Sequence, residues 1–310
     1  MTKLGTSDLD VFPLCLGGNV FGWTADREQS FAVLDAYAAT GGNFVDTADV
    51  YSAWAPGNSG GESETIIGEW LAARGNRDDV VVATKVGMLD GLTTLSSANI
   101  RTAAENSLRR LGVDHIDLYY AHQDDAGTPL EETLSAFDAL VRDGKVRHIA
   151  ASNFTPARLS ESLAVSAREG LASYVALQPH YNLVERAGYE QELATVVADA
   201  KLSAVPYFSL AKGFLTGKYR PGVEVDSPRA RGAGAYLDER GGRVLAALDE
   251  IAAAHDTTVA AVSLAWLAAQ PTVAAPIASA RTPEQLAELL PVASLTLTGA
   301  ELGRLDAASS

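Results

Sequence analysis

The sequence has 310 residues, of which 39 are acidic and 24 are Lys or Arg, so the formal charge at pH 7 is −15. This balance argues against duplex DNA or an anionic membrane surface as a partner, because both require a basic face. No apolar stretch approaches membrane-spanning length, and the N-terminus has no apolar signal core, so a cytoplasmic location is expected. The single cysteine, Cys15, lies in an apolar run and is expected to be a small buried residue.

Eight short runs rich in β-branched and aromatic residues predict strands. They cover residues 11–17, 43–47, 80–85, 116–121, 147–152, 174–178, 204–208 and 272–277. Segments with helical spacing lie between them, several with serine or proline at the start and glycine at the end. Because strands and helices alternate without a Gly/Pro-rich linker, the chain is predicted to be α/β, a single (β/α)8 TIM barrel over residues 1–310.

Two features exceed a minimal barrel. A long loop at 217–236 follows the seventh strand and precedes two helical patterns, at 242–255 and 258–270, where one would suffice. A further helical pattern at 298–308 ends the chain. Since long loops in compact domains are usually functional or mobile, the 217–236 loop is expected to fold over a ligand.

Polar residues end three of the apolar runs: Asp46, Lys85 and His122, with Tyr51 shortly after Asp46. In barrels of this type the active site lies at the C-terminal ends of the strands. Lysine is seldom buried without a partner, so Lys85 is expected to pair with Asp46 and, as an ammonium, to lower the pKa of Tyr51. Taken singly, each residue has an ordinary explanation as a cap, a loop histidine or a packing aromatic. Together they suit the donation of a proton to a carbonyl oxygen.

Eight stretches carry a resemblance to a known family, and their order and spacing make it specific. They are NFVDTADVYS, GESETIIGEWL, VVVATKVG, LRRLGVDHIDLYYAH, GKVRHIAASNF, LQPHYNLVER, FSLAKGFLTGKY and PIASARTPEQL. The chain resembles the aldo-keto reductase superfamily over essentially its whole length, most closely its bacterial branches, and also the cytosolic β subunits of voltage-gated potassium channels. The resemblance implies a (β/α)8 barrel, a nicotinamide cofactor and reversible carbonyl reduction. It makes Asp46, Tyr51, Lys85 and His122 the catalytic residues, with Tyr51 as general acid.

The same resemblance implies that the later strand ends bind the cofactor. The matching residues are Ser152, Asn153, Gln178, Tyr207, Ser209, Leu210, Ala211, Lys212, Gly213, Lys218, Ser279, Arg281 and Gln285. Lys218 is equally well explained as an ordinary surface charge. A guanidinium such as that of Arg281 suits a 2′-phosphate, so NADPH is expected. NADH is the second candidate, because Ser279 and Ala280 stand where many relatives carry glycine or lysine.

The substrate side of the site is predicted less sharply. Trp23, Trp54 and Tyr181 follow the first, second and sixth strands, and we expect them to form an aromatic wall at the mouth of the site, although packing of loops would also explain them. The glycine-rich loop at 52–61 is expected to shape or gate the entrance. A small carbonyl or alcohol is the expected partner, no metal site is predicted, and the chain is expected to be a monomer or a weak homo-oligomer.

Three alternatives remain at this stage. Residues 57–61 match the Gly-x-Ser-x-Gly pattern of serine hydrolases, with Ser59 as nucleophile, but that pattern requires a buried strand directly before it. A regulatory protein that binds the nucleotide as a redox sensor would explain the likeness to channel subunits. A sugar or alcohol dehydrogenase would use the same chemistry in the opposite direction.

Overall fold

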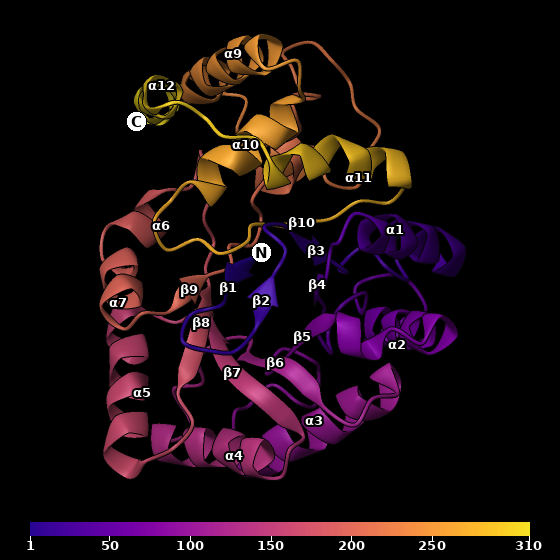
Figure 1. The fold of residues 1–310 in the computed structure, drawn as a ribbon, viewed down its shortest axis with the longest axis vertical. Helices are drawn as coiled ribbons and strands as arrows, with labels where there is room; N and C mark the ends of the chain where they lie inside the picture. Colours follow the sequence, from indigo (N-terminus) through magenta and orange to yellow (C-terminus); the bar gives the residue numbers. More distant parts are fainter.

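Eight parallel strands form a ring surrounded by helices, as Figure 1 shows for a computed structural model that describes residues 1–310. Their order in the sheet is β10-β3-β4-β5-β6-β7-β8-β9. The strands of the ring are β3 (Cys15–Gly17), β4 (Phe44–Asp46), β5 (Val81–Val86), β6 (Ile116–Ala121), β7 (Val146–Ser152), β8 (Tyr174–Gln178), β9 (Ser203–Ala204) and β10 (Ile277–Ala278).

The ring is closed by hydrogen bonds between its two shortest strand regions. The amide of Ala204 donates to the carbonyl of Thr272 at 2.7 Å, and the amide of Ala274 donates to the carbonyl of Ala204 at 2.9 Å. The amide of Ile277 donates to the carbonyl of Pro206 at 2.9 Å. Because no sheet edge remains between β9 and β10, the predicted (β/α)8 barrel is confirmed.

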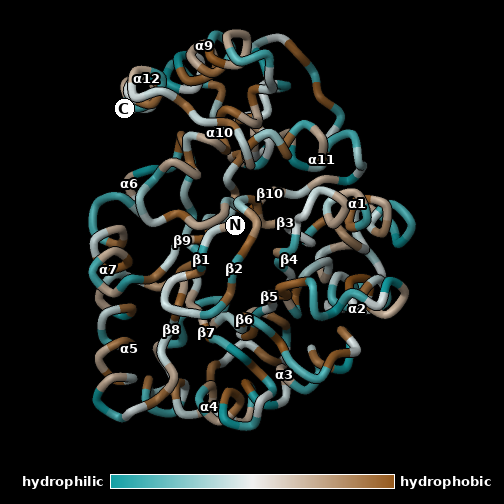
Figure 2. Tube along the Cα trace, viewed as in Figure 1, coloured by the Kyte–Doolittle hydropathy of each residue, from teal (hydrophilic) through white to brown (hydrophobic).

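Helices cover the outside of the ring, and hydrophilic and hydrophobic residues alternate along them (Figure 2). Three of them, α2, α3 and α5, end at a left-handed glycine, as the sequence predicted. The α-helices are α1 (Arg27–Ala39), α2 (Glu62–Arg74), α3 (Ser97–Leu111), α4 (Leu130–Arg142), α5 (Pro156–Glu169), α6 (Ala187–Glu190), α7 (Leu193–Asp199), α8 (Ala230–Gly234), α9 (Glu239–Ala254), α10 (Val259–Ala268), α11 (Pro283–Leu289) and α12 (Gly299–Ser309). Short 3₁₀ segments are η1 (Arg77–Asp79), η2 (Ala211–Thr216) and η3 (Leu290–Ala293).

The extra helices after the seventh strand and at the C-terminus are present as predicted. Helices α8, α9 and α10 lie between β9 and β10, and α12 packs on α9. No single helix is long and apolar enough to cross a membrane; α9 and α10 reach that length only as a pair bent by 99°.

Three strand predictions were wrong in extent. The predicted strand 11–17 is divided between β2 (Asp10–Val11), which pairs antiparallel with β1 (Thr2–Lys3), and β3 of the ring. The predicted strand 204–208 is reduced to β9, and 272–277 is displaced to β10. Prolines explain the interruptions, because Pro13, Pro206 and Pro276 have no amide hydrogen for a ladder bond.

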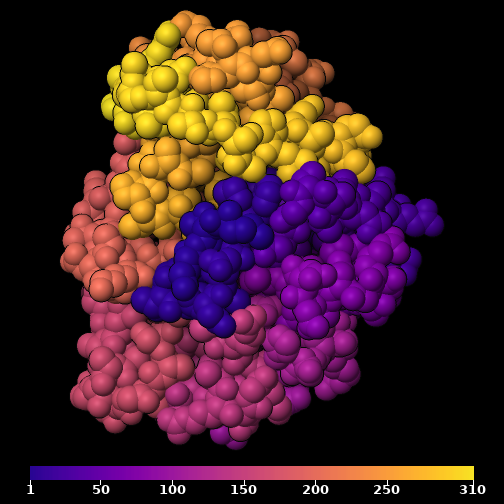
Figure 3. Space-filling model, viewed as in Figure 1, coloured from indigo at the N-terminus to yellow at the C-terminus, as the bar shows by residue number.

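The N-terminal hairpin covers one end of the barrel. In Figure 3 the first residues of the chain lie over the middle of the face in view. Leu4, Leu9 and Val11 of the hairpin join a buried apolar cluster with strand residues such as Phe44 and Leu118. This end is therefore filled by side chains, and the strands open toward the other end.

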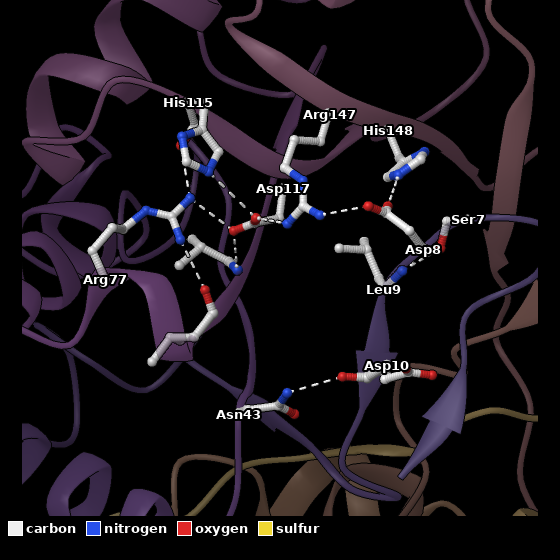
Figure 4. Close-up of polar contacts among 12 residues, drawn as sticks. Ser7, Asp8, Leu9, Asp10, Asn43, Arg77, His115, Asp117, Arg147 and His148 are labelled. Carbon is white, nitrogen blue, oxygen red and sulfur yellow. Dashed lines mark hydrogen bonds and ion pairs between the residues drawn. The ribbon is translucent and has the colours of Figure 1, made fainter.

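A polar network joins the hairpin to the strand starts (Figure 4). The buried carboxylate of Asp117 accepts hydrogen bonds from Arg77 at 2.8 Å, from Arg147 at 2.9 Å and from the amide of Val82 at 2.9 Å. Arg147 also bonds Asp8 of the hairpin at 3.0 Å. One carboxylate thus connects β5, β6, β7 and, through Arg147, the N-terminal segment.

Replacing Asp117 by Asn is expected to lower the free energy of unfolding by about 2–3 kcal/mol. The substitution removes the charge that two guanidinium groups share and places an amide donor against them. Urea denaturation at pH 7 measures the change. The matched control is Asp114→Asn, since the Asp114 side chain is 92% exposed. Equal stabilities of the two variants would contradict a structural role for Asp117.

Candidate active site

The two-residue period of the strands explains why polar side chains gather inside the barrel at its open end. Residues deeper in the barrel are apolar: Phe44, Ala83, Leu118, Ala150 and Ala176. Successive residues of a strand face opposite sides, so the residues two or four positions further along point to the same interior. These are Asp46, Lys85, His122, Ser152 and Gln178.

Lys85 is the centre of this group. Its Nζ donates to Asp46 Oδ2 at 2.7 Å, to the Thr47 carbonyl at 2.7 Å and to Tyr51 Oη at 2.9 Å. The Tyr51 hydroxyl lies 3.1 Å from Asp46 Oδ2. Because the Lys85 side chain is fully buried and that of Asp46 nearly so, the predicted ion pair is present and is desolvated.

The proton affinity of Tyr51 differs from the sequence-based expectation. Burial, followed by the carboxylate of Asp46, raises the pKa of Tyr51 well above its ordinary value of 10. The expected net lowering of this pKa is therefore wrong, because burial and the Asp46 carboxylate both favour the protonated phenol. Burial also lowers the pKa of Lys85, which Asp46 opposes. At neutral pH the Tyr51 hydroxyl consequently carries its proton and is able to donate it.

His122 follows β6 directly and lies beside Tyr51, with ring centroids 6.1 Å apart. Burial, with a smaller contribution from Lys85, lowers the pKa of His122 well below its ordinary value of 6.5. Its Nδ1 is buried and has no hydrogen-bond partner in the protein. A neutral imidazole is thus available to bind an uncharged oxygen.

The structure adds one contact to this group that the sequence did not indicate. Gln178 Nε2 donates to Asp46 Oδ1 at 2.9 Å, so each oxygen of Asp46 has a partner. Gln178 was predicted only as a cofactor residue. Because 132 positions separate the two residues, only the closed ring of strands brings them together.

A cavity of about 1170 Å³ opens above these residues. Most residues predicted for the cofactor and the substrate line it: Trp23, Trp54, Ser152, Asn153, Gln178, Tyr207, Ser209, Leu210, Lys212, Gly213, Lys218, Ser279, Arg281 and Gln285. Trp23 and Trp54 pack edge to face at 5.7 Å, and Trp54 lies 6.1 Å from the ring of Tyr51. The predicted loop at 217–236 contributes Ser227, Pro228 and Arg229 to the wall.

Hydrogen bonds hold the side chains of Ser152, Asn153 and Tyr207 in place at one wall of the cavity. Tyr207 Oη donates to Asn153 Oδ1 at 2.8 Å, and Asn153 Nδ2 donates to the His122 carbonyl at 2.9 Å. Ser152 Oγ donates to the Gln178 carbonyl at 2.9 Å. Asn153 adopts a left-handed backbone conformation, with φ of 55°. Asparagine tolerates this conformation better than most residues, and it forms the sharp turn directly after β7.

Two predicted site residues do not reach the cavity. Tyr181 is buried, donates to Glu190 at 2.7 Å and packs against Tyr189 and Trp266, so its assignment to the aromatic wall was wrong. An aromatic residue after a strand is equally suited to line a cavity or to pack against neighbouring helices, and the sequence does not distinguish the two positions. The side chain of Ala211 is also buried, within η2.

Four basic side chains line the cavity without an ion pair to any carboxylate: Lys212, Lys218, Arg229 and Arg281. In a chain with 39 acidic residues, this grouping of unpaired cations points to an anionic ligand. Arg229 was not predicted. Burial and the nearby Arg281 lower the pKa of Arg229, and its guanidinium lies 5.9 Å from the Trp23 ring.

The structure does not support the serine hydrolase alternative. Ser59 is exposed in the loop before α2, where its amide donates to the Glu62 carboxylate at 2.8 Å. A nucleophile of that class stands on a sharp turn directly after a buried strand. The glycines around Ser59 therefore belong to the loop that leads into α2.

Comparisons with known proteins agree with this geometry. A family model described as the Aldo/keto reductase family matches residues 13–310. The oxidoreductase YrpG of Bacillus subtilis is 35% identical over 96% of this chain and 91% of its own length. The norsolorinic acid reductase stcV of Emericella nidulans is 33% identical over 94% of this chain and 75% of its own. A probable voltage-gated potassium channel subunit beta of Oryza sativa is 32% identical over 92% and 88%.

Proposed function

Because the chain belongs to the aldo/keto reductase family, we propose that it reduces aldehydes or ketones with NADPH, reversibly, and that Tyr51 is the general acid. The observation that carries the proposal is the contact of Lys85 with both Tyr51 and Asp46 at the base of the large cavity. A buried hydroxyl that keeps its proton, beside a cation, suits the protonation of an oxygen that is becoming an alkoxide.

The residues of the cavity are suited to a dinucleotide with several phosphates. The volume of about 1170 Å³ leaves room for an extended ligand. Lys212, Gly213 and Gly217 line the cavity and have positive φ, so the chain turns sharply beside the unpaired cations. Arg281 and Arg229 would bind the adenosine phosphates, and Asn153 and Gln178 would bind the carboxamide of the nicotinamide. When bound, the nicotinamide supplies the hydride.

The roles of the other side chains follow from their contacts. As Tyr51 Oη gives its proton to the substrate oxygen, Lys85 Nζ at 2.9 Å stabilises the tyrosinate that remains. Asp46 and Gln178 hold Lys85 in position. The neutral ring of His122 orients the carbonyl oxygen beside Tyr51. In the opposite direction the tyrosinate accepts a proton from an alcohol, so the same site is consistent with an alcohol or sugar dehydrogenase.

The aromatic wall suggests where to look for substrates. Trp54 packs edge to face on both Trp23 and Tyr51, an arrangement that suits flat apolar molecules. A purely regulatory nucleotide sensor needs no proton donor, and the complete Asp46, Tyr51, Lys85 and His122 group therefore favours catalysis.

Oxidation of NADPH in the presence of a panel of aromatic and aliphatic aldehydes and ketones tests the proposal. We expect steady-state turnover with at least one aromatic carbonyl. Tight binding of NADPH without turnover of any carbonyl or alcohol in the panel would instead support the sensor alternative.

Replacing Arg281 by Ala is expected to raise KM for NADPH about 10–100-fold, while KM for NADH changes little. The reason is the loss of one charge-assisted contact to a 2′-phosphate, which NADH lacks. The control is Arg101→Ala, because Arg101 is exposed on α3. Equal changes for the two cofactors would remove Arg281 from the 2′-phosphate site.

A further inference from the structure

A second, smaller cavity lies on the far side of Tyr207. It has a volume of about 200 Å³ and shares two lining residues, Asn153 and Tyr207, with the large cavity. His180, the second residue after β8, also lines it. The ring of Tyr207 thus separates two cavities, one of which contains the proposed cofactor site.

His180 supports the ring of Tyr207 from behind. The two rings are stacked, with centroids 5.3 Å apart and planes 14° from parallel. Every other aromatic pair in the protein is edge-to-face or tilted, so this parallel arrangement is specific to the wall of the cavity. A parallel bridge between the two residues, with the Tyr207 amide donating to the Pro179 carbonyl at 3.0 Å, fixes their backbones.

The surroundings keep the His180 ring uncharged. Burial lowers the pKa of His180 below its ordinary value of 6.5; Lys212 of η2 adds to this effect, and Glu185 of the loop after β8 opposes it. The Glu185 carboxylate is partly engaged, because it accepts the Tyr236 hydroxyl at 3.0 Å. His180 Nε2 is buried and has no hydrogen-bond partner, so Glu185 acts on the ring through its charge and not through a hydrogen bond to this nitrogen.

We propose that His180 is a positioning residue whose neutral ring supports Tyr207 and sets the relative affinity of the site for the oxidised and the reduced cofactor. This inference rests on the proposed function and adds that the nicotinamide ring lies against Tyr207, because Tyr207 lines the cavity and donates to Asn153, a residue proposed to bind the carboxamide. The oxidised nicotinamide ring is a cation and the reduced ring is neutral. A positive charge on the other side of Tyr207 would therefore weaken binding of NADP⁺ and leave binding of NADPH almost unchanged. A neutral aromatic ring at position 180 avoids that penalty.

Equilibrium dissociation constants for NADP⁺ and NADPH, measured by fluorescence titration without substrate, test the inference. In wild type the ratio of Kd for NADP⁺ to Kd for NADPH is expected to be constant above pH 6.5 and to rise about fivefold as His180 becomes protonated at lower pH. Protonation of the 2′-phosphate affects both cofactors and cancels in the ratio. His180→Phe, which keeps a flat ring without a titrating group, is expected to give a ratio independent of pH.

A permanent charge supplies the complementary measurement. His180→Arg places a planar cation against Tyr207 and is expected to raise the ratio about fivefold at pH 7.5. An unchanged ratio in a folded His180→Arg protein, or the same pH dependence in wild type and His180→Phe, would overturn the inference. The wild-type and His180→Phe comparison decides by itself if the arginine variant does not fold.

The Tyr207→Ala variant distinguishes an error in the role of His180 from an error in the proposed cofactor site. If the nicotinamide lies against Tyr207, this variant binds both cofactors more weakly. Unchanged affinities would reject the placement of the cofactor, and with it the inference. Weaker binding of both, together with an unchanged ratio in His180→Arg, would reject only the role of His180.

Discussion

Replacing Tyr51 by Phe is expected to lower kcat for carbonyl reduction by about 10²–10⁴-fold, the usual contribution of a positioned general acid. The variant lacks only the hydroxyl that contacts Lys85 and Asp46. Lys85 keeps its bonds to Asp46 and to the Thr47 carbonyl, so the buried charges remain paired and the fold should be retained. Steady-state kinetics with saturating NADPH and one aromatic aldehyde measure the loss.

The matched control is Tyr119→Phe. Tyr119 is buried on β6, and its hydroxyl has no hydrogen-bond partner, so its removal changes a tyrosine without touching the proposed proton donor. We expect near wild-type kcat for this control and unchanged NADPH affinity for both variants. A Tyr51→Phe enzyme with wild-type kcat would show that another group, or water, protonates the substrate.

The strand ends of the active site were predictable because their polar residues conflict with their surroundings. A lysine after VVVAT and an aspartate after NFV have few structural reasons to be there, and the two-residue period of a strand places them inside the barrel. This prediction did not require knowledge of how neighbouring strands are aligned in the sheet. Even where β10 was displaced by Pro276, Ser279 still follows the strand directly, and Arg281 still reaches the cavity.

Contacts that depend on packing could not be predicted in this way. The sequence places Tyr181 after the sixth predicted strand and Tyr207 near the end of the seventh, and nothing in their local pattern says that the first packs on Trp266 while the second lines the cavity. The stack of His180 on Tyr207 joins residues 27 positions apart whose rings meet only because β8 and β9 are adjacent. The net pKa of Tyr51 likewise depends on burial, which the sequence does not give.

Asp49 illustrates the same limit, because the motif DTAD contains two aspartates with different environments. Asp46 is bonded to Lys85 and Gln178, whereas the Asp49 carboxylate is fully buried and neither of its oxygens has a hydrogen-bond partner. Burial, and then the nearby carboxylate of Glu64, raise the pKa of Asp49 from 3.8 to about 7; Arg110 opposes them. The Arg110 guanidinium donates to the Glu64 carboxylate at 2.6 Å. Arg110 is therefore engaged by Glu64 and does not form an ion pair with Asp49.

A raised pKa in the folded state makes stability depend on pH in a definite direction. The folded protein binds the Asp49 proton more tightly than the unfolded chain, so the contribution is fully present below pH 3.8 and is lost as the pH rises to about 7. A rise from 3.8 to about 7 corresponds to roughly 4 kcal/mol. Asp49→Asn cannot ionise, and we expect this part of the pH dependence to disappear in the variant.

Urea denaturation at pH 5 and at pH 8 measures the part of this effect that falls above pH 5, about 3 kcal/mol, as a difference between wild type and Asp49→Asn. The new amide is itself buried without a partner, but that cost is the same at both pH values and cancels in the comparison. Carboxylates that do not interact with Asp49 titrate in both proteins and also cancel, and Glu64, which does interact with it, is bonded to Arg110. Asp90→Asn, at an exposed turn, controls for the loss of one surface charge. If the stability of Asp49→Asn changed between pH 5 and pH 8 as much as that of wild type, Asp49 would have to be ionised, and hydrated, across the whole range.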